Sequence, residues 1–202
     1  MNNILLLGSK SPSRVMLLTE ARIPFRTIPQ DMDESQCALG LSFTDKVYHI
    51  ALHKMDHVIL PVGNKKDEYC FVLTADTMVC DASGTIHGKP IDREDAIKKI
   101  KGARNGSTAC TAFCLDKKIW NGHVWVTQIR IAQYVTVNYV FDVPDTWIDI
   151  YLDTTIGQQC AGGAAVEGFG SQFLRSVNGS HSALIGLPLY EVREALEQLG
   201  FF

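Results

Sequence analysis

The feature that most constrains the fold is an apolar run at residues 4–8, Ile-Leu-Leu-Leu-Gly, followed at once by the hydrophilic residues 9–14. A short, continuous apolar run is typical of a buried β-strand. Pro12 suits the first turn of an α-helix, and Ser11 suits its N-cap. The sequence therefore predicts a strand that leads directly into a helix.

The junction between this strand and helix is a candidate anion site. The exposed N–H groups of a helix N-terminus carry partial positive charge, and Arg14 adds a full one. Ser9 and Ser11 place hydroxyl groups at the same junction. The alternative is an ordinary capped helix without a ligand, because short motifs of this kind also occur by chance.

Length and charge narrow the class of protein. The chain has 202 residues and a formal net charge of −3. We expect one domain, residues 1–202, which can bury a core without disulfides or metals. A nucleic-acid-binding protein would need a basic field, and a membrane protein a longer apolar stretch. Because no signal peptide is recognisable either, we expect a cytoplasmic protein that binds neither nucleic acid nor membranes.

The cysteines do not form a metal-binding or disulfide pattern. None of the six belongs to a Cys-x-x-Cys pair, and they are spread along the chain. We expect free thiols in a reducing compartment. The residues are Cys37, Cys70, Cys80, Cys110, Cys114 and Cys160.

Hydrophobic periodicity predicts strands and helices in alternation along the first half of the chain, and several consecutive strands further on. This order fits an α/β or α+β domain with a twisted, mixed sheet flanked by helices. Helices are expected at residues 43–58, 92–101, 144–152 and 188–199. Strands are expected at residues 23–28, 69–74, 78–80, 110–115, 119–120, 124–131 and 135–141.

Lys54 stands out in the first long predicted helix. It lies in line with Val47, Ala51 and Val58 on the apolar face. A lysine there either extends its ammonium to an edge or faces a polar cavity, and both interpretations remain open. His49, His53 and His57 lie on the opposite face at a spacing that can bind a metal or can equally be a solvated surface.

Acidic residues form two further candidates. Asp31, Asp33 and Glu34 follow a predicted strand, and such carboxylates suit Mg²⁺ or Mn²⁺ as well as a solvated turn. Asp76 falls at a predicted break between the apolar runs 71–73 and 78–80. A carboxylate at a strand end in buried surroundings is a candidate general base or metal ligand.

Two loops complete the list of candidates. Lys89 lies in a Gly-Lys-Pro segment, which is a turn on its own and a second phosphate contact if it lies beside an anion site. Residues 160–170 are rich in glycine and alanine, and Glu167 is the only charged residue among them. Because small residues allow a backbone to approach a ligand closely, we expect this segment to form a pocket wall.

Taken together, these segments resemble the Maf family of nucleoside triphosphate pyrophosphatases over nearly the whole chain. Each motif is weak alone, but six in order with similar spacing are specific. The matching residues are Ser9, Ser11, Pro12 and Arg14; Asp31, Asp33 and Glu34; Ala51 and Lys54; Ala75, Asp76 and Thr77; Gly88, Lys89 and Pro90; and Ala161, Gly162, Gly168, Gly186, Leu187, Pro188 and Leu189.

The resemblance implies a two-lobed α/β fold with a cleft, often a homodimer, and a divalent cation, Mg²⁺ or Mn²⁺. It implies cleavage of a nucleoside triphosphate to the monophosphate and pyrophosphate. By similarity, Asp76 is the catalytic base. The phosphate-binding residues are Ser9, Ser11, Arg14, Lys54 and Lys89, and the metal ligands are Glu34, Asp33 and Asp76.

Three positions bear on which nucleobase the substrate carries. Glu167 resembles the family branch that acts on 7-methyl-GTP, whereas the branch that acts on dTTP and UTP has glutamine there. A carboxylate can accept both donors of guanine, N1–H and the 2-amino group, while the carbonyls of thymine and uracil would repel it. Thr77 matches the pyrimidine branch, and Ser13 matches neither branch.

We therefore expect a pyrophosphatase that prefers 7-methyl-GTP, with dTTP and UTP as the alternative substrates. Two other classes remain open. One is a nucleotide-binding regulator with weak catalysis, which the unusual Ser13 favours. The other is a metal-binding domain built on cysteine or histidine.

Overall fold

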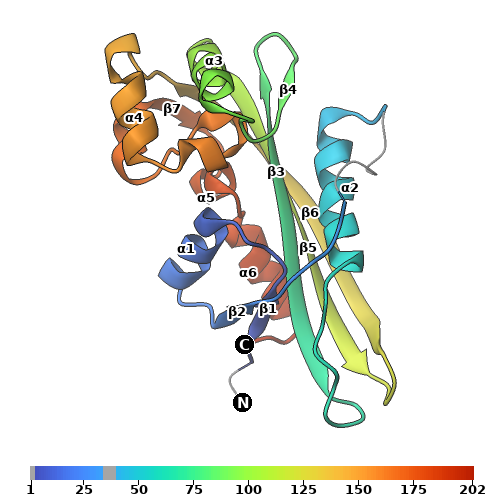
Figure 1. Ribbon diagram of the computed structural model, residues 1–202. Helices are drawn as coiled ribbons and strands as arrows, with labels where there is room; N and C mark the ends of the chain where they lie inside the picture. Colours follow the sequence, from blue (N-terminus) through green and yellow to red (C-terminus); the bar gives the residue numbers. More distant parts are fainter. Residues whose placement is uncertain (1–2, 34–39) are drawn as a thin grey trace. The chain divides into compact units, whose positions relative to one another are not determined.

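The computed structural model describes residues 3–33 and 40–202 (Figure 1). The observed class is the predicted one, a mixed sheet flanked by helices. The longer elements are β1 (Leu5–Leu7), α1 (Pro12–Glu20), β2 (Phe25–Thr27), α2 (Phe43–Asp56), β3 (Tyr69–Asp81), β4 (Ile86–His87), α3 (Arg93–Ala103), β5 (Ser107–Trp120), β6 (Trp125–Phe141), α4 (Ile148–Thr154), β7 (Leu174–Asn178), α5 (His181–Ile185) and α6 (Leu189–Gln198). Short 3₁₀ helices lie at η2 (Asp145–Trp147), η3 (Gly157–Gln159), η4 (Ala161–Gly163) and η5 (Gly168–Phe173).

The chain divides into two compact units. The first comprises Met1–Asp76, Ala112–Tyr134 and Gly186–Phe202, and the second Thr77–Thr111 and Val135–Ile185. The strands are hydrogen-bonded in the order β2-β1-β3-β5-β6-β7, and β4 pairs with β3. The strands β3, β5 and β6 contribute residues to both units.

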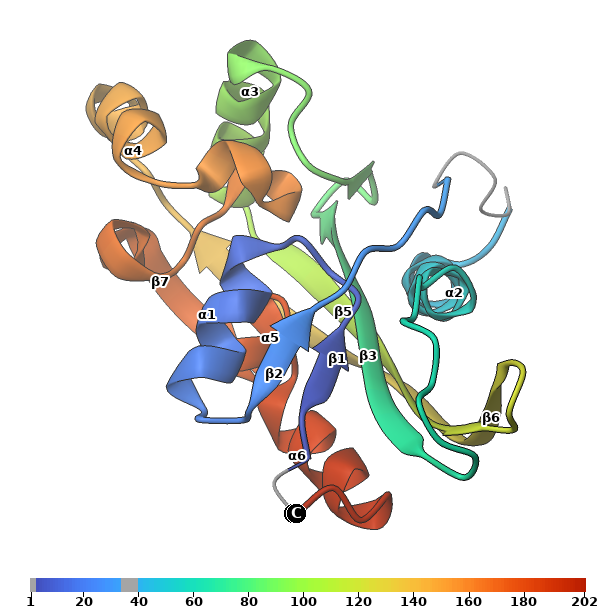
Figure 2. The same cartoon turned by 60° about the horizontal axis from the view of Figure 1, so that its bottom comes forward.

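The first unit begins with the predicted strand and helix. The strand β1 pairs in parallel with β2 and with β3, so that Leu5 lies opposite both Phe25 and Phe71 (Figure 2). The helix α1 connects β1 to β2 and buries Leu17 and Leu18. Parallel strands need such a connection, because a tight turn cannot return the chain in the same direction.

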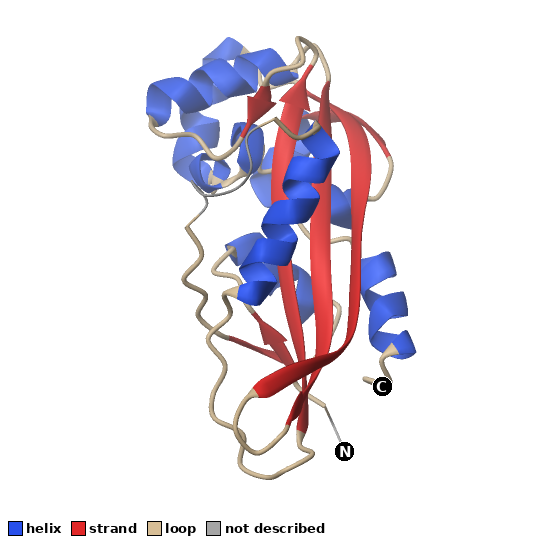
Figure 3. Cartoon of the chain, turned by 90° about the vertical axis from the view of Figure 1, so that its right-hand side faces the viewer, coloured by secondary structure: helices blue, strands red, loops and turns tan. Residues whose placement is uncertain are grey.

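The helix α2 lies along one face of the long strands (Figure 3). Its buried residues include Val47, Ile50 and Ala51, as the predicted apolar stripe requires. Met55 of α2 packs in a core cluster with Val72 of β3 and with residues of β1 and β5. The side chain of Ser42 caps the helix by accepting a hydrogen bond from the Asp45 N–H.

The second unit adds a hairpin and an antiparallel strand. The strands β3 and β4 pair around a turn that closes with a hydrogen bond from the Gly84 N–H to the Asp81 carbonyl. The strand β7 pairs antiparallel with β6. The helix α3 starts after Asp92, whose side chain accepts from the Asp95 N–H, as predicted for this N-cap. Its buried face joins a core of mainly aliphatic and aromatic residues from α4 and β6.

The predicted break at Asp76 is wrong, because β3 is one continuous strand from Tyr69 to Asp81. Alternate residues of a strand face opposite sides of the sheet, so a single charged residue need not end it. Asp76 faces Lys54 of α2, which forms an ion pair with it. The sequence suggested a break because the partner that makes a buried carboxylate tolerable lies in another segment.

Two further pairs of predicted strands are merged, and the first of them for the same reason. The charged residues 116–118 separate two predicted strands, but they lie inside the continuous strand β5. Asp116 is fully buried there and is paired with Arg130 and Lys118. Residues 132–134 also stay extended, so that β6 runs unbroken from Trp125 to Phe141.

Other boundaries shift by a few residues, and some elements were not expected. The strand β2 is shorter than residues 23–28, α2 ends at Asp56 instead of residue 58, and the region 144–152 is a 3₁₀ turn followed by α4. The elements β7 and α5 were not predicted, because both are only five residues long and so show little periodicity. None of the helices in the described part has an apolar stretch long enough to span a lipid bilayer.

The packing predicts different roles for the two C-terminal phenylalanines. Phe201 is 3 % exposed and contacts Phe71 edge to face, whereas Phe202 is 69 % exposed. We expect Phe201→Ala to lower the free energy of unfolding by about 3–5 kcal/mol, because it leaves a cavity beside Phe71. We expect Phe202→Ala to change it by less than about 0.5 kcal/mol. Urea unfolding of both variants checks this, and equal losses would contradict the described packing.

Candidate functional site

Arg14 organises the loop between β1 and α1. Its Nε donates to the Gly186 carbonyl at 2.9 Å, and its Nη1 donates to Ser9 Oγ at 3.1 Å. Ser9 Oγ also accepts from the Ser11 N–H, at 3.2 Å. Ser11 occupies the predicted N-cap position of α1, but its side chain makes no capping hydrogen bond. The loop thus gathers a buried guanidinium, hydroxyl groups and a helix N-terminus, an arrangement that favours an anion.

Lys54 and Asp76 form a close ion pair in the same unit. Lys54 Nζ donates to Asp76 Oδ1 at 2.6 Å, and each residue is 8 % exposed. The structure therefore answers the question that the sequence left open, because the ammonium faces a buried carboxylate instead of extending to an edge. An ion pair with so little solvent around it is costly to maintain for stability alone.

Strand register places the loop after β1 beside the part of β3 that carries Asp76. Leu7 of β1 lies opposite Leu73 of β3, and the Gly8 N–H donates to the Leu73 carbonyl at 2.8 Å. Ser9 is thus two residues past Leu7, and Asp76 is three residues past Leu73. Since β1 and β3 run in parallel in this register, the loop that follows the carboxyl end of β1 lies beside the middle of β3, next to Asp76.

Ser13 is buried in the first turn of α1, with 5 % of its surface exposed. Asp31 and Asp33 are exposed, whereas Glu34 lies outside the described residues. Among the residues that the structure describes, no group of three or more His, Cys, Asp or Glu side chains is placed to hold a metal ion. The predicted metal ligands agree with Mg²⁺ or Mn²⁺ in their chemistry, since all three are hard carboxylate oxygens.

The remaining candidates belong to the second unit, and Thr77 is the first of them. Thr111 Oγ1 donates to the Ala183 carbonyl at 2.7 Å, so its proton is already used. Thr77 Oγ1 lies 2.9 Å from Thr111 Oγ1 and therefore donates to it. A ligand would meet Thr77 as a hydrogen-bond acceptor.

Lys89 is exposed in a loop whose backbone carbonyls accept hydrogen bonds from other segments. The Lys89 carbonyl accepts from Lys99 Nζ at 3.2 Å. The neighbouring Gly88 carbonyl accepts from the Gly162 N–H at 3.1 Å. Lys99 is itself paired with Asp95 at 2.7 Å. The loop is thus held in place, while the side chain of Lys89 stays in contact with solvent.

A buried tyrosine shapes the glycine-rich segment that leads to Glu167. Tyr151 is fully buried, its hydroxyl donates to the Gly163 carbonyl at 2.8 Å, and it accepts from the Ala165 N–H at 2.6 Å. Burial raises the pKa of this phenol above its usual value. The sequence held no signal for this role, since a tyrosine in a short helix is typical of an ordinary core residue.

Glycine is required at several positions of this segment. Gly162 and Gly163 have positive φ angles, and a Cβ on Gly170 would lie 1.8 Å from the Ala165 carbonyl oxygen. Glu167 is half-buried and directly precedes η5. The segment is therefore a shaped backbone and not a loose surface loop, as the expected pocket wall requires.

Within residues 3–33 and 40–202, the histidines and cysteines do not gather into the metal site that the alternative metal-binding domain would need. His57 Nδ1 donates to the His53 carbonyl at 2.8 Å, and the two rings lie 4.7 Å apart, without the further ligands a metal centre would need in the described part. The five described cysteines are free, and Cys37 lies outside the described residues. Burial raises the pKa of Cys70 and of Cys114 to about 12, so neither thiol is activated.

The second unit also contains a cavity of about 350 Å³ that none of the sequence-predicted site residues lines. It is lined by residues from the end of β3 and from β5, β6 and β7, including Thr108, Asn138 and Asn178. Thr108 Oγ1 donates to Asn138 Oδ1 at 2.7 Å. Lysine and arginine are absent from the residues that line it, so this cavity is not suited to a triphosphate.

Comparison with known proteins gives the following findings. The family model described as "Maf-like protein" matches residues 4–199. A "dTTP/UTP pyrophosphatase" of Colwellia psychrerythraea is 32 % identical over 199 residues, covering 98 % of this chain and 89 % of the relative. A "Nucleoside triphosphate pyrophosphatase" of Trichormus variabilis is 31 % identical over 200 residues, covering 97 % and 93 %. A solved HAM1 protein from Coxiella burnetii aligns at 12 % identity with a TM-score of 0.39, over 69 % of this chain and 73 % of that one.

The two hydrogen bonds of Tyr151 make a testable prediction. We expect Tyr151→Phe to lower the free energy of unfolding by about 1–3 kcal/mol, because it leaves the buried Gly163 carbonyl and Ala165 N–H without this partner. The matched control is Tyr190→Phe, whose side chain is exposed and which we expect to leave stability unchanged. Thermal unfolding followed by calorimetry measures both, and a silent Tyr151→Phe would show that the hydroxyl does not hold the segment.

Proposed function

This chain belongs to the Maf family of nucleoside triphosphate pyrophosphatases, and we propose that it cleaves its substrate at the Lys54–Asp76 pair. The observation that carries the proposal is the 2.6 Å contact between Lys54 Nζ and Asp76 Oδ1, with both side chains almost fully buried. The loop of Ser9 and Arg14, which we propose to bind phosphate, follows β1, the strand that pairs with β3. One unit thus holds both a phosphate-binding group and a candidate base.

The proposed reaction is hydrolysis at the α-phosphorus. A water oxygen forms a bond to the α-phosphorus while Asp76 takes its proton, and the bond from the α-phosphorus to the bridging oxygen breaks. The electron pair of that bond leaves with pyrophosphate, and the nucleoside monophosphate remains. Arg14 and Lys54 stabilise the negative charge of the triphosphate, because fixed cations in a buried site cost no reorganisation during the reaction.

Lys89 is proposed as a further phosphate-binding residue on the strength of its Gly-Lys-Pro motif. A divalent cation, Mg²⁺ or Mn²⁺, would be held by Glu34, Asp33 and Asp76. When bound, it would supply neutralisation of the phosphate charge. Hard carboxylate oxygens are the donors that such a cation prefers.

For the nucleobase of the substrate, we propose a guanine derivative, and 7-methyl-GTP is the specific candidate nucleotide. The second unit offers acceptors at two of the three specificity positions, the Glu167 carboxylate and the Thr77 hydroxyl oxygen. Guanine presents two adjacent donors, whereas thymine and uracil present one donor between two carbonyls. Two hydrogen-bond acceptors, at Glu167 and Thr77, therefore suit guanine better than thymine or uracil.

Cleavage of dTTP and UTP is the second candidate, and the names of several relatives, "dTTP/UTP pyrophosphatase", favour it. Those relatives are about 30 % identical to this chain. The side chain at position 167 is the physical feature that separates the two candidates.

The role of Asp76 as catalytic base is tested by measuring hydrolysis. With Mg²⁺ or Mn²⁺, we expect pyrophosphate release from one member of a panel of 7-methyl-GTP, GTP, dTTP, UTP and CTP. We expect Asp76→Asn to lower kcat by a factor of about 10² to 10⁴, because the amide cannot take a proton. Chelation by EDTA should stop the wild-type reaction, and added Mg²⁺ should restore it.

A binding measurement is the control for this assay. If Asp76→Asn binds nucleotide as the wild type does and melts at the same temperature, the loss of turnover belongs to the carboxylate. If the wild type binds nucleotide but releases no pyrophosphate from any of the five, the chain is a nucleotide-binding regulator and the proposed reaction fails.

The role of Glu167 in nucleobase specificity is tested by its amide variant. We expect Glu167→Gln to lower kcat/KM for 7-methyl-GTP by about 10-fold or more, since an amide can accept from only one of the two guanine donors through its single oxygen. The same variant should gain activity on dTTP. Steady-state kinetics on both nucleotides test this, and an unchanged ratio of the two kcat/KM values would remove position 167 from the account of specificity.

A further inference from the structure

The proposed site depends on how α2 is held. Lysine carries its charge on a long, flexible side chain, so the side chain alone does not fix Nζ, and the pair with Asp76 also depends on where the backbone of α2 is held. A helix end without tertiary contacts frays, and Lys54 lies in the last turn of α2, two residues before its end at Asp56. The contacts of the α2 C-terminal turn therefore decide how well Lys54 is placed against Asp76.

The first of these contacts comes from β3. Thr74 is fully buried, and its Oγ1 donates to the Ala51 carbonyl of α2 at 2.8 Å. Ala51 precedes Lys54 by three residues, about one helical turn. Thr74 precedes Asp76 by two residues and points to the same side of the strand. This bond ties the turn before Lys54 to the strand that carries Asp76.

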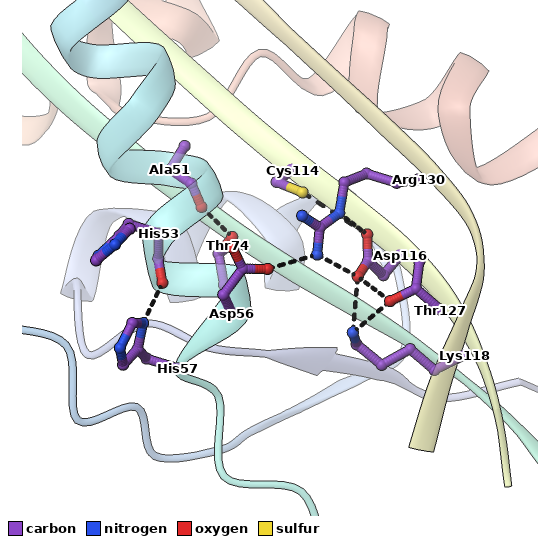
Figure 4. A network of polar contacts seen from close by, with 10 residues as sticks. All are labelled: Ala51, His53, Asp56, His57, Thr74, Cys114, Asp116, Lys118, Thr127 and Arg130. Carbon is purple, nitrogen blue, oxygen red and sulfur yellow. Dashed lines mark hydrogen bonds and ion pairs between the residues drawn. The ribbon is translucent and has the colours of Figure 1, made fainter. Parts of the chain in front are cut away.

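The second contact begins at Asp116, which is completely buried in β5 (Figure 4). Arg130 of β6 binds it with two parallel hydrogen bonds, from Nε to Oδ1 at 2.7 Å and from Nη2 to Oδ2 at 2.9 Å. Lys118 Nζ lies 2.8 Å from Oδ2, and Thr127 Oγ1 donates to the same oxygen at 3.0 Å. This bidentate geometry fixes the orientation of the guanidinium.

Arg130 then reaches from the sheet to the helix. Its Nη2 also donates to Asp56 Oδ1 at 2.8 Å, and Asp56 is the last residue of α2 (Figure 4). The Asp56 side chain is 53 % exposed, so an isolated ion pair here would contribute little to stability. The guanidinium is held by Asp116, however, so no conformational freedom of Arg130 remains to be lost when it binds Asp56.

The electrostatics of the network are balanced. Burial alone would raise the pKa of Asp116, but the hydrogen bonds from Arg130 and Lys118 outweigh it and leave the pKa below its usual value. The hydrogen bond with Asp116 in turn raises the pKa of Arg130. Two carboxylates face two cations in this network, so their formal charges cancel.

We propose that Arg130 and Asp56 are positioning residues for the reaction, which hold the last turn of α2 on the sheet so that Lys54 stays against Asp76. Asp116 anchors Arg130, which in turn binds Asp56, and the hydrogen bond from Thr74 to Ala51 holds the preceding turn of α2. Neither Arg130 nor Asp56 belongs to the motifs that carry the family resemblance. The proposal rests on the proposed function, because it assigns Lys54 and Asp76 to the reaction.

Asp56→Asn is the variant that tests the proposal. It removes the charge that Arg130 binds but leaves the buried Asp116–Arg130 pair and the fold intact. Glu197→Gln is the matched control, because Glu197 is 54 % exposed in its side chain and accepts from Arg193 at 2.6 Å on α6 of the same unit. Both changes replace an exposed carboxylate in an arginine ion pair by its amide.

Two measurements are made on the wild type and both variants. Hydrogen–deuterium exchange should become faster in the α2 C-terminal turn of Asp56→Asn and stay unchanged in Glu197→Gln. The kcat/KM for the best nucleotide should fall about fivefold in Asp56→Asn and stay unchanged in the control. The loss should disappear when Asp56→Asn is added to Lys54→Gln, since residues that act as a unit are not additive.

Each result decides the proposal. Equal exchange in all three proteins overturns it, because Asp56 then does not hold the helix. A fivefold loss that persists in the Lys54→Gln background also overturns it, because Asp56 then acts independently of Lys54. If the wild type hydrolyses no nucleotide, the proposed function fails, while the exchange measurement still shows whether α2 is held by Asp56.

Discussion

The structure depends on one constraint, that a carboxylate buried in a sheet needs a cation at hydrogen-bond distance. An isolated charge taken out of water costs several kcal/mol, about as much as a whole domain has to spare. Asp76 meets this requirement through Lys54, and Asp116 through Arg130 and Lys118. Both carboxylates lie in the first unit, on the long strands β3 and β5.

This constraint couples the packing of α2 to the chemistry. The helix must bring Lys54 to β3, and it must also end where Asp56 meets Arg130. Its apolar stripe alone would allow small rotations and shifts along the sheet, because hydrophobic contacts are not directional. The directional bonds at Ala51, Lys54 and Asp56 select one placement. A helix that reads as ordinary packing is thus also the support of the proposed catalytic pair.

Several features were predictable from local sequence because their causes are local. The strand and helix around residues 4–14, the Asp92 cap and the inward face of Lys54 all follow from patterns within a few residues, and the structure confirms them. The breaks expected at Asp76 and at residues 116–118 were wrong for the opposite reason. A charged residue usually marks a strand end, and the partners that reverse this rule lie 22 and 14 residues away in the chain.

The sequence by itself therefore determined the class of fold, the family and the order of the motifs, since hydrophobic periodicity and motif spacing are properties of the linear chain. Only the tertiary structure decided that Lys54 faces Asp76, that Thr77 offers an acceptor, and that Tyr151 shapes the segment before Glu167. These facts concern the direction of hydrogen bonds between distant segments. Such directions depend on backbone positions to within a fraction of an ångström, which no linear pattern encodes.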